Sequence, residues 1–292
     1  MTKSMFKNEQ AKVKLTEWFD RFRARLPLPT ESRVVQTAFG STHVLVGGPV
    51  NAPPLVLLHG AMASSAHALV ELSGLMENFR VYAVDVMGQS VKSADARPSV
   101  LNDEYGRWLV EVMDGLSLPK AHVVGISWGG FVSIRLAAFA PSRITRLVLL
   151  VPAGLVGGSA WEGFTRMGLP MALYLMWPTP ERLKKFVANL LTTLDDDWAP
   201  YLGDAFLSFN MNMTIPMVAK PEEFKGFTVP TLVMAADDDV SFPGAKLLER
   251  AGRIFPSLAG TELIADCRHC PPTTPVFRSW LLGQITTFLR PE

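Results

Sequence analysis

The sequence predicts an α/β protein with a mostly parallel central sheet covered by helices on both faces. Short continuous apolar runs alternate with helical patterns along most of the chain, which is typical of such a sheet. About half of the 292 residues (48%) are apolar, enough to bury a sizeable core. Only two cysteines are present, so no disulfide framework holds the fold.

The first elements precede the regular alternation. A helix is expected over residues 11–26, where apolar residues recur near helical spacing with lysine and arginine opposite them. A basic amphipathic helix is compatible with a membrane surface, but packing against the edge of the domain is favoured. Its apolar positions are Val13, Trp18, Phe19, Phe22 and Leu26. Strands at 42–48 and 55–58, joined by a Gly/Pro-rich turn, are expected to form an antiparallel pair.

The remaining elements alternate in order. Segment 100–116 is the strongest helix, since seven apolar residues share one face. Those residues are Leu101, Tyr105, Trp108, Leu109, Val112, Met113 and Leu116. Further helices are expected at 66–76, 128–140, 244–255 and up to 289, and further strands at 80–85, 121–127, 143–154, 229–239 and 261–267.

One region interrupts this alternation. No strand-like run occurs in 154–227, which is helical in pattern and rich in Met, Trp and Phe. It lies between two core strands, where an inserted helical cap would sit. The expected organisation is an N-terminal helical extension (1–30), a core (31–153 and 228–292) and a cap (154–227).

Charge and composition exclude several classes of partner. The net charge is +1 and the basic residues are scattered, so nucleic-acid binding is not expected. No run of 18 apolar residues predicts a membrane span, so stable membrane insertion is not expected. The charged N-terminus does not resemble a signal peptide, which predicts a cytoplasmic protein. The sequence leaves monomer and dimer open.

The stretch "GISWGG" places Ser127 between a predicted strand and a predicted helix. G-x-S-x-G alone is a weak signal, but this context makes it specific. A sharp turn leaves no room for side chains at Gly125 and Gly129, and it exposes the serine hydroxyl at the carboxyl edge of the sheet. The helix N-terminus after it offers free N–H groups. Ser127 is therefore the candidate nucleophile.

A serine nucleophile needs a base and an orienting carboxylate. Of the five histidines, His269 follows the last predicted strand in a loop at the carboxyl edge of the sheet, where ligands gather in open α/β sheets. His43 and His122 are expected to be structural. Three consecutive carboxylates, Asp237, Asp238 and Asp239, follow another strand, and position alone leaves the choice among them open.

The chain resembles the α/β-hydrolase family, and within it the group that carries a helical cap between the sixth strand and the next. The order Ser127, Asp239, His269 matches the family's order of nucleophile, acid and histidine. "ADDDVSFP" resembles the family's Gly-x-x-Asp followed by an apolar residue and Pro, and this resemblance selects Asp239. "LLHGAMASS" resembles its His-Gly-x segment, which implies an oxyanion hole made by the amides of Ala61 and Trp128.

The chain departs from the family pattern at three places. Ala236 and Arg268 stand where the family usually has glycine, and "DVMGQSVKS" lacks the familiar Gly-x-Gly-x-Ser. These departures leave the expected triad intact but weaken any transfer of subfamily or substrate. Met62 and Trp128 are expected to line the substrate pocket. Six further methionines are left open between pocket lining and core: Met167, Met171, Met176, Met211, Met213 and Met217.

The resemblance implies a serine hydrolase that cleaves a carboxylic ester of a small to medium, fairly apolar substrate through an acyl-enzyme, without metal or organic cofactor. C–C bond hydrolysis, thioester hydrolysis and perhydrolysis use the same triad and remain alternatives. A ligand-binding protein with little turnover is the alternative from another class. Cys267 and Cys270 match Cys-x-x-Cys, but they bracket His269 and precede two prolines, so packing is favoured over redox or metal chemistry.

Overall fold

An eight-stranded, mostly parallel sheet forms the centre of the protein in the computed structural model, which describes residues 4–212 and 214–290. The strand order is β1-β2-β4-β3-β5-β6-β7-β8. β1 and β2 pair antiparallel, β2 pairs antiparallel with β4, and every later pairing is parallel. The strands are β1 (Thr30–Thr37), β2 (Gly40–Gly47), β3 (Pro54–Leu58), β4 (Arg80–Val84), β5 (Ala121–Ile126), β6 (Ile144–Leu150), β7 (Thr231–Ala236) and β8 (Leu258–Ile264).

The predicted sheet is confirmed, with two corrections at its first edge. β1 was not expected, and it forms a hairpin with β2. β2 runs opposite to β3, as expected, but does not pair with it, because β4 lies between them. The Gly/Pro-rich segment after β2 therefore carries the chain past one strand position rather than closing a hairpin.

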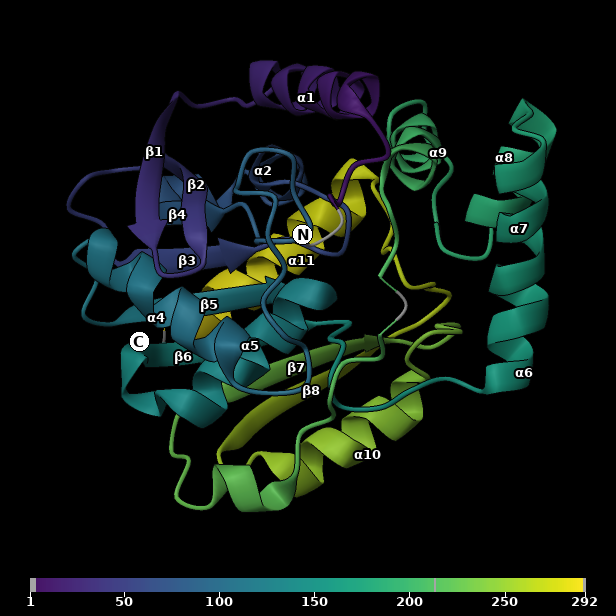
Figure 1. Ribbon diagram of the computed structural model, residues 1–292. Helices are drawn as coiled ribbons and strands as arrows, with labels where there is room; N and C mark the ends of the chain where they lie inside the picture. Colours follow the sequence, from purple (N-terminus) through teal and green to yellow (C-terminus); the bar gives the residue numbers. More distant parts are fainter. Residues whose placement is uncertain (1–3, 213, 291–292) are drawn as a thin grey trace.

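Helices cover both faces of this sheet (Figure 1). The expected helix over 66–76 is two shorter ones, α2 and α3. The helices outside the segment between β6 and β7 are α1 (Glu9–Ala24), α2 (Ser65–Glu71), α3 (Leu75–Asn78), α4 (Glu104–Gly115), α5 (Trp128–Phe139), α10 (Gly244–Ile254) and α11 (Pro275–Leu289).

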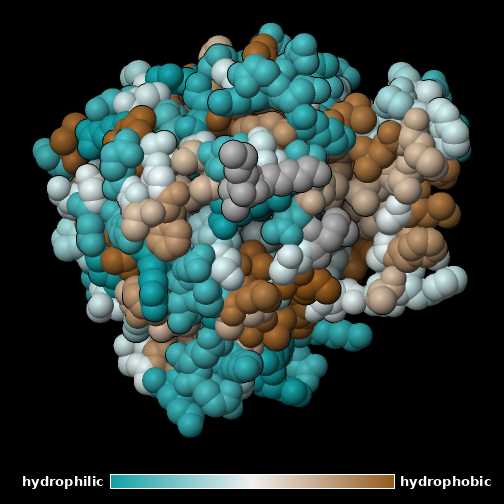
Figure 2. All heavy atoms as spheres, in the orientation of Figure 1, coloured by the Kyte–Doolittle hydropathy of each residue, from teal (hydrophilic) through white to brown (hydrophobic). Residues whose placement is uncertain are grey.

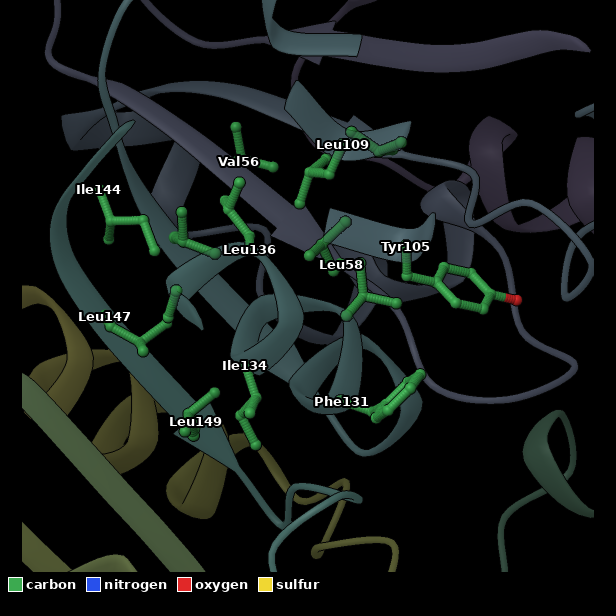
Figure 3. Packing of buried hydrophobic residues seen from close by; sticks show 14 of the residues in the cluster. Val56, Leu58, Tyr105, Leu109, Phe131, Ile134, Leu136, Ile144, Leu147 and Leu149 are labelled. Carbon is green, nitrogen blue, oxygen red and sulfur yellow. The ribbon is translucent and has the colours of Figure 1, made fainter. Parts of the chain in front are cut away.

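Two apolar cores result from the alternation of side chains along the strands. On β3, Val56 and Leu58 pack toward α4 and α5, whereas Leu55 and Leu57 pack on the opposite face with α1, α2 and α11. Figure 3 shows the first core, in which Tyr105 and Leu109 of α4 meet the residues of α5 and the strands. All four leucine and valine side chains of β3 are completely buried, so this strand is central.

The N-terminal helix α1 packs against α2 and α9, with Trp18, Phe19 and Phe22 buried. The indole of Trp18 donates a hydrogen bond to Asp204 of α9 (2.9 Å). Val13, expected on the apolar face, is half exposed, and Leu15 takes its place in the core. The expected packing of this helix against the domain is therefore confirmed for most of its apolar residues.

The segment between β6 and β7 forms helices and no strand among its described residues. It contains α6 (Ala160–Glu162), a π-helical turn (Gly163–Gly168), α7 (Leu169–Met176), α8 (Pro180–Val187), α9 (Trp198–Ser208) and a short 3₁₀ turn (Pro221–Phe224). We call residues 154–227 the insert. Tyr174, Phe186 and Phe206 belong to a small core of its own. Its α7 and α8 stand at the right of Figure 1, and apolar residues reach the surface there in Figure 2.

Candidate active site

Ser127 occupies a sharp turn between β5 and α5. Its backbone has φ 50° and ψ −108°, a conformation that side-chain-bearing residues rarely adopt and that functional sites often hold. The turn is fixed on both sides, since the Ser127 amide donates to Leu150 (2.9 Å) and its carbonyl accepts from the Ala153 amide (3.0 Å). The last residue of β6 and the segment that follows it thus stabilise the strained backbone of Ser127.

The glycines around Ser127 are required by space. A Cβ on Gly125 would lie 2.3 Å from the Ser133 hydroxyl, and one on Gly129 would lie 2.2 Å from the carbonyl oxygen of Leu58. Both distances are far below van der Waals contact, and the Leu58 carbonyl belongs to a central strand that cannot yield. The steric reason expected from the sequence is therefore the one observed.

Three side chains from distant parts of the chain meet at the carboxyl edge of the sheet. Ser127 Oγ lies 2.8 Å from His269 Nε2, and His269 Nδ1 lies 2.7 Å from Asp239 Oδ2. Asp239 is buried, and its second oxygen accepts hydrogen bonds from the amides of Ser241 (2.7 Å) and Phe242 (3.1 Å). The two amides hold the Asp239 carboxylate in place. The carboxylate in turn orients the imidazole of His269 toward the hydroxyl of Ser127.

The other two carboxylates of the triplet point elsewhere. Asp237 accepts hydrogen bonds from the amides of Cys267 and Asp266 (both 2.9 Å). The hydrogen bond from Cys267 is the main cause that lowers the pKa of Asp237. Asp238 is half exposed and pairs with Arg166 of the insert (3.0 Å) and Arg268 (3.6 Å). Only Asp239 contacts the imidazole of His269.

The peptide between Gly60 and Ala61 is held by a buried histidine. His59 Nδ1 lies 2.7 Å from the Gly60 carbonyl oxygen, while its Nε2 accepts a hydrogen bond from the Val86 amide (2.9 Å). Burial lowers the pKa of His59, so the ring is neutral and its proton resides on Nδ1. Because the peptide is planar, fixing the carbonyl also fixes the direction of the Ala61 N–H.

Two amides are available near Ser127. The Ala61 amide donates no hydrogen bond within the described part of the chain. The Trp128 amide begins α5 and has no intrahelical acceptor. Both residues line the same cavity as Ser127 and His269. Two free N–H groups beside a nucleophile can bind an oxyanion.

Met62 follows Ala61 in a left-handed conformation (φ 55°). Its amide donates to Gln89 (3.2 Å), and its carbonyl accepts a hydrogen bond from the hydroxyl of Tyr201 on α9. The roles of Gln89 and Tyr201 were not predicted. No local sequence pattern marks either residue, because their contacts with Met62 join segments that are distant in the chain.

The cavity beside Ser127 has a volume of about 390 Å³, within the range typical of small-molecule sites. Met62 and Trp128 line it, as does Met167 of the insert. The other insert methionines that the structure describes do not: Met171 and Met217 pack against apolar clusters, and Met176 and Met211 are exposed. Met213 lies outside the described residues.

The loop that carries His269 is tied to the insert. The Cys270 amide donates to the Leu190 carbonyl (2.8 Å), and the Thr192 hydroxyl binds both the Cys270 carbonyl and the Arg268 amide (2.8 Å each). The guanidinium of Arg268 donates to the carbonyls of Ala188 and Leu191. Arg268 therefore joins the histidine loop to the end of α8.

The cysteines beside His269 are free thiols. Cys267 is buried and Cys270 half-buried, and burial raises the pKa of the Cys267 thiol to about 11. A thiol with a raised pKa is unreactive near neutral pH.

Residues 4–212 and 214–290 contain no group of three or more His, Cys, Asp and Glu placed to hold a metal. None of the helices in these residues is both long and apolar enough to cross a membrane.

Known proteins resemble this chain over most of its length. Two come from Bacillus subtilis (strain 168): an uncharacterized carboxylesterase, nap, is 29% identical over 259 residues, covering 83% of this chain and 82% of its own. Carboxylesterase YbfK is 28% identical over 262 residues, covering 86% of each chain. The crystal structure of naproxen esterase (carboxylesterase NP) from Bacillus subtilis has a TM-score of 0.82 at 23% identity, covering 97% of this chain and 100% of its own. A family model described as alpha/beta hydrolase fold matches residues 53–211, more than half of the chain. The chain therefore belongs to the alpha/beta hydrolase fold family.

Proposed function

We propose that the protein is a carboxylic ester hydrolase in which Ser127, His269 and Asp239 form the catalytic triad. The observation that carries this proposal is the unbroken hydrogen-bond chain from Ser127 Oγ to Asp239, with links of 2.8 and 2.7 Å. The similarity to bacterial carboxylesterases over more than four-fifths of the chain supports the same reaction class.

In the proposed reaction His269 Nε2 takes the proton of Ser127 Oγ as the oxygen attacks the ester carbonyl. Asp239 holds Nδ1 protonated and stabilises the imidazolium that forms. The tetrahedral intermediate collapses, and the alcohol leaves with the proton from His269. Water, deprotonated by the same imidazole, then attacks the acyl-enzyme, and Ser127 regains its proton as the acid departs.

The amides of Ala61 and Trp128 are the proposed oxyanion donors. Each such donor contributes about 10²–10³ in rate. His59 acts as a positioning residue, because its hydrogen bond to the Gly60 carbonyl orients the Ala61 N–H. The two sides of the hole are thus supplied by a loop fixed by His59 and by the start of α5.

We further propose that the insert, residues 154–227, is a cap on a core made of residues 31–153 and 228–292, with residues 1–30 as an N-terminal extension. Leu190, Leu202 and Phe206 of the insert line the cavity together with Ser127. Their apolar side chains favour a small to medium, fairly apolar substrate. Met62 and Trp128 provide wall on the core side of the cavity.

Turnover of a short-chain p-nitrophenyl ester panel by the wild type and Ser127→Ala tests the proposal. A catalyst loses about 10⁴-fold or more in kcat when its nucleophile is removed. Mass spectrometry after treatment with an ester-mimicking phosphonate should show one adduct on the wild type and none on Ser127→Ala. Equal turnover by the two proteins would contradict catalysis by Ser127 and favour a ligand-binding role.

A further inference from the structure

The part of the cavity wall supplied by α2 and α11 carries the charged side chains Glu71 and Arg278, whereas most of the wall is apolar. We call this part the α2–α11 end and define it by Ala68 and Glu71 of α2, Leu72 directly after α2, and Arg278 and Leu281 of α11. These residues line the same cavity as Ser127 and His269. A substrate bound to Ser127 therefore has access to whatever chemistry this end offers.

Glu71 and Arg278 are paired there, but part of their hydrogen-bonding capacity is unused. Arg278 Nη2 donates to Glu71 Oε1 at 2.6 Å. Within the described part of the chain, Arg278 Nε is buried without a partner, Nη1 donates no hydrogen bond, and Glu71 Oε2 accepts none. Nε has almost no accessible surface, so a ligand in the cavity cannot reach it. Nη1 belongs to a side chain that lines the cavity and is 28% exposed, so it is the donor that remains for an acceptor supplied by a ligand.

The net charge of this end is close to zero. Burial raises the pKa of Glu71, but the adjacent guanidinium of Arg278 opposes that effect and compensates the carboxylate. His67 lies one helical turn before Glu71, with Nε2 3.9 Å from Oε1, and burial lowers its pKa to about 3. The imidazole is therefore neutral near pH 7, and the site presents a balanced pair of charges.

This balance limits the ligand group. A carboxylate approaching Arg278 would also meet Glu71, and an ammonium approaching Glu71 would meet Arg278. A neutral oxygen avoids both of these like-charge repulsions, because it accepts a hydrogen bond from the guanidinium without adding charge. The wall around the pair is apolar, from Ala68, Leu72 and Leu281, and suits a hydrocarbon arm leading to that oxygen.

We propose that the α2–α11 end is a specificity subsite for a neutral hydrogen-bond acceptor, a ketone or ether oxygen, on one arm of an ester substrate, with Arg278 as donor. The subsite rests on the proposed ester hydrolysis at Ser127. Substrates of this class are oxo- or alkoxy-substituted esters. Simple alkyl esters fill the same space but leave the Arg278 donors unmatched.

Matched ester pairs test the subsite. The first series comprises p-nitrophenyl esters of pentanoic, hexanoic and heptanoic acids against the same acids with a ketone on the penultimate carbon. The second places the same ketone in the alcohol arm of an acetate. For the wild type, kcat/KM should favour the oxo ester of at least one pair by about tenfold, the value of one hydrogen bond to a charged group.

Variants identify the donor. Arg278→Met removes the guanidinium, and Glu71→Met/Arg278→Met replaces the pair by apolar side chains that keep the wall packed. Both should bring the oxo-to-alkyl ratio close to one. A matched control, Glu249→Met/Arg253→Met, removes the exposed pair on α10 and should leave the wild-type ratio unchanged.

Each outcome tests either the proposed subsite or the proposed ester hydrolysis on which it rests. A wild-type ratio near one in every pair, or a ratio that survives in Glu71→Met/Arg278→Met, overturns the subsite and leaves ester hydrolysis standing. Preference for the p-nitrophenyl hemiester of glutaric acid over all neutral esters would show an anion site and also overturn it. Turnover of every ester at the Ser127→Ala level would refute the proposed function itself.

Discussion

At the residue scale, the three consecutive aspartates have three different partners. Asp239 contacts His269, Asp237 binds the amides of Asp266 and Cys267, and Asp238 pairs with arginines at the surface. Asp239→Asn should therefore lower kcat by about 10⁴-fold, because the imidazole is left in the wrong tautomer. Steady-state kinetics on one nitrophenyl ester with all three Asn variants measures this ranking.

The two neighbouring variants serve as controls in that series. Asp237→Asn should act mainly on stability, since it weakens the anchoring of the loop before His269, and Asp238→Asn should change little, because exposed ion pairs contribute about 0–1 kcal/mol. If Asp237→Asn had the lowest kcat of the three, the assignment of Asp239 would be wrong. The choice of Asp239 depended on a family pattern, because a single sequence does not show which of three adjacent carboxylates reaches the histidine.

At the element scale, glycines within helices differ sharply in their surroundings, and the strand-turn-helix at Ser127 depends on one of them, Gly129. Gly129→Ala should destabilise the protein by about 1–3 kcal/mol or more, because its Cβ would meet the rigid carbonyl of Leu58 at 2.2 Å. Gly252→Ala in α10 meets nothing within 4 Å and should stabilise by about 0.5–1 kcal/mol. Urea denaturation of both variants tests the pair, and equal effects would contradict the steric explanation.

The elements predicted from the sequence are those with a strong local pattern. The buried strands read as continuous apolar runs, and α4 reads as a helix with one apolar face. β1 has no such signal: as an edge strand it buries only Val35, while Val34 is 61% exposed. Its place is set by pairing with β2, and a single-sequence pattern does not reveal an edge strand of this kind.

At the scale of the whole molecule, buried neutral histidines link stability to pH. Burial is the main cause that lowers the pKa of His67 from 6.5 to about 3. Between these values the unfolded chain binds a proton that the folded chain does not. The stabilisation is therefore complete above about pH 6.5 and is lost as pH falls toward 3.

His67→Leu should remove this contribution. Between about pH 6 and 4, the free energy of unfolding of the wild type should fall more steeply than that of the variant, by about 1.4 kcal/mol per pH unit. Urea denaturation of both proteins at pH 7, 6, 5 and 4 gives the two curves. Glu71 and Arg278 are common to both, so the difference isolates the imidazole; parallel curves would contradict its burial in the neutral form.

The strand order belongs to this scale too and was only partly predictable. That most strands are parallel follows from the helices between them, but the position of β4 between β2 and β3 depends on long-range pairing. The meeting of Ser127 with His269 was predictable because carboxyl ends of parallel strands share one edge. The contacts of Arg268, Gln89 and Tyr201 were not, since they join segments distant in the chain that only the complete fold brings together.

The hydrogen bonds between the histidine loop and the insert have a consequence for protein engineering. Arg268, Cys270 and Thr192 hold the two segments together on both sides of His269. A chimera that exchanged residues 154–227 for the corresponding part of another hydrolase would also replace Thr192 and the backbone segment whose carbonyls accept from Arg268. Grafting a new specificity onto this scaffold therefore requires residues 188–192 and 266–273 to be transplanted together.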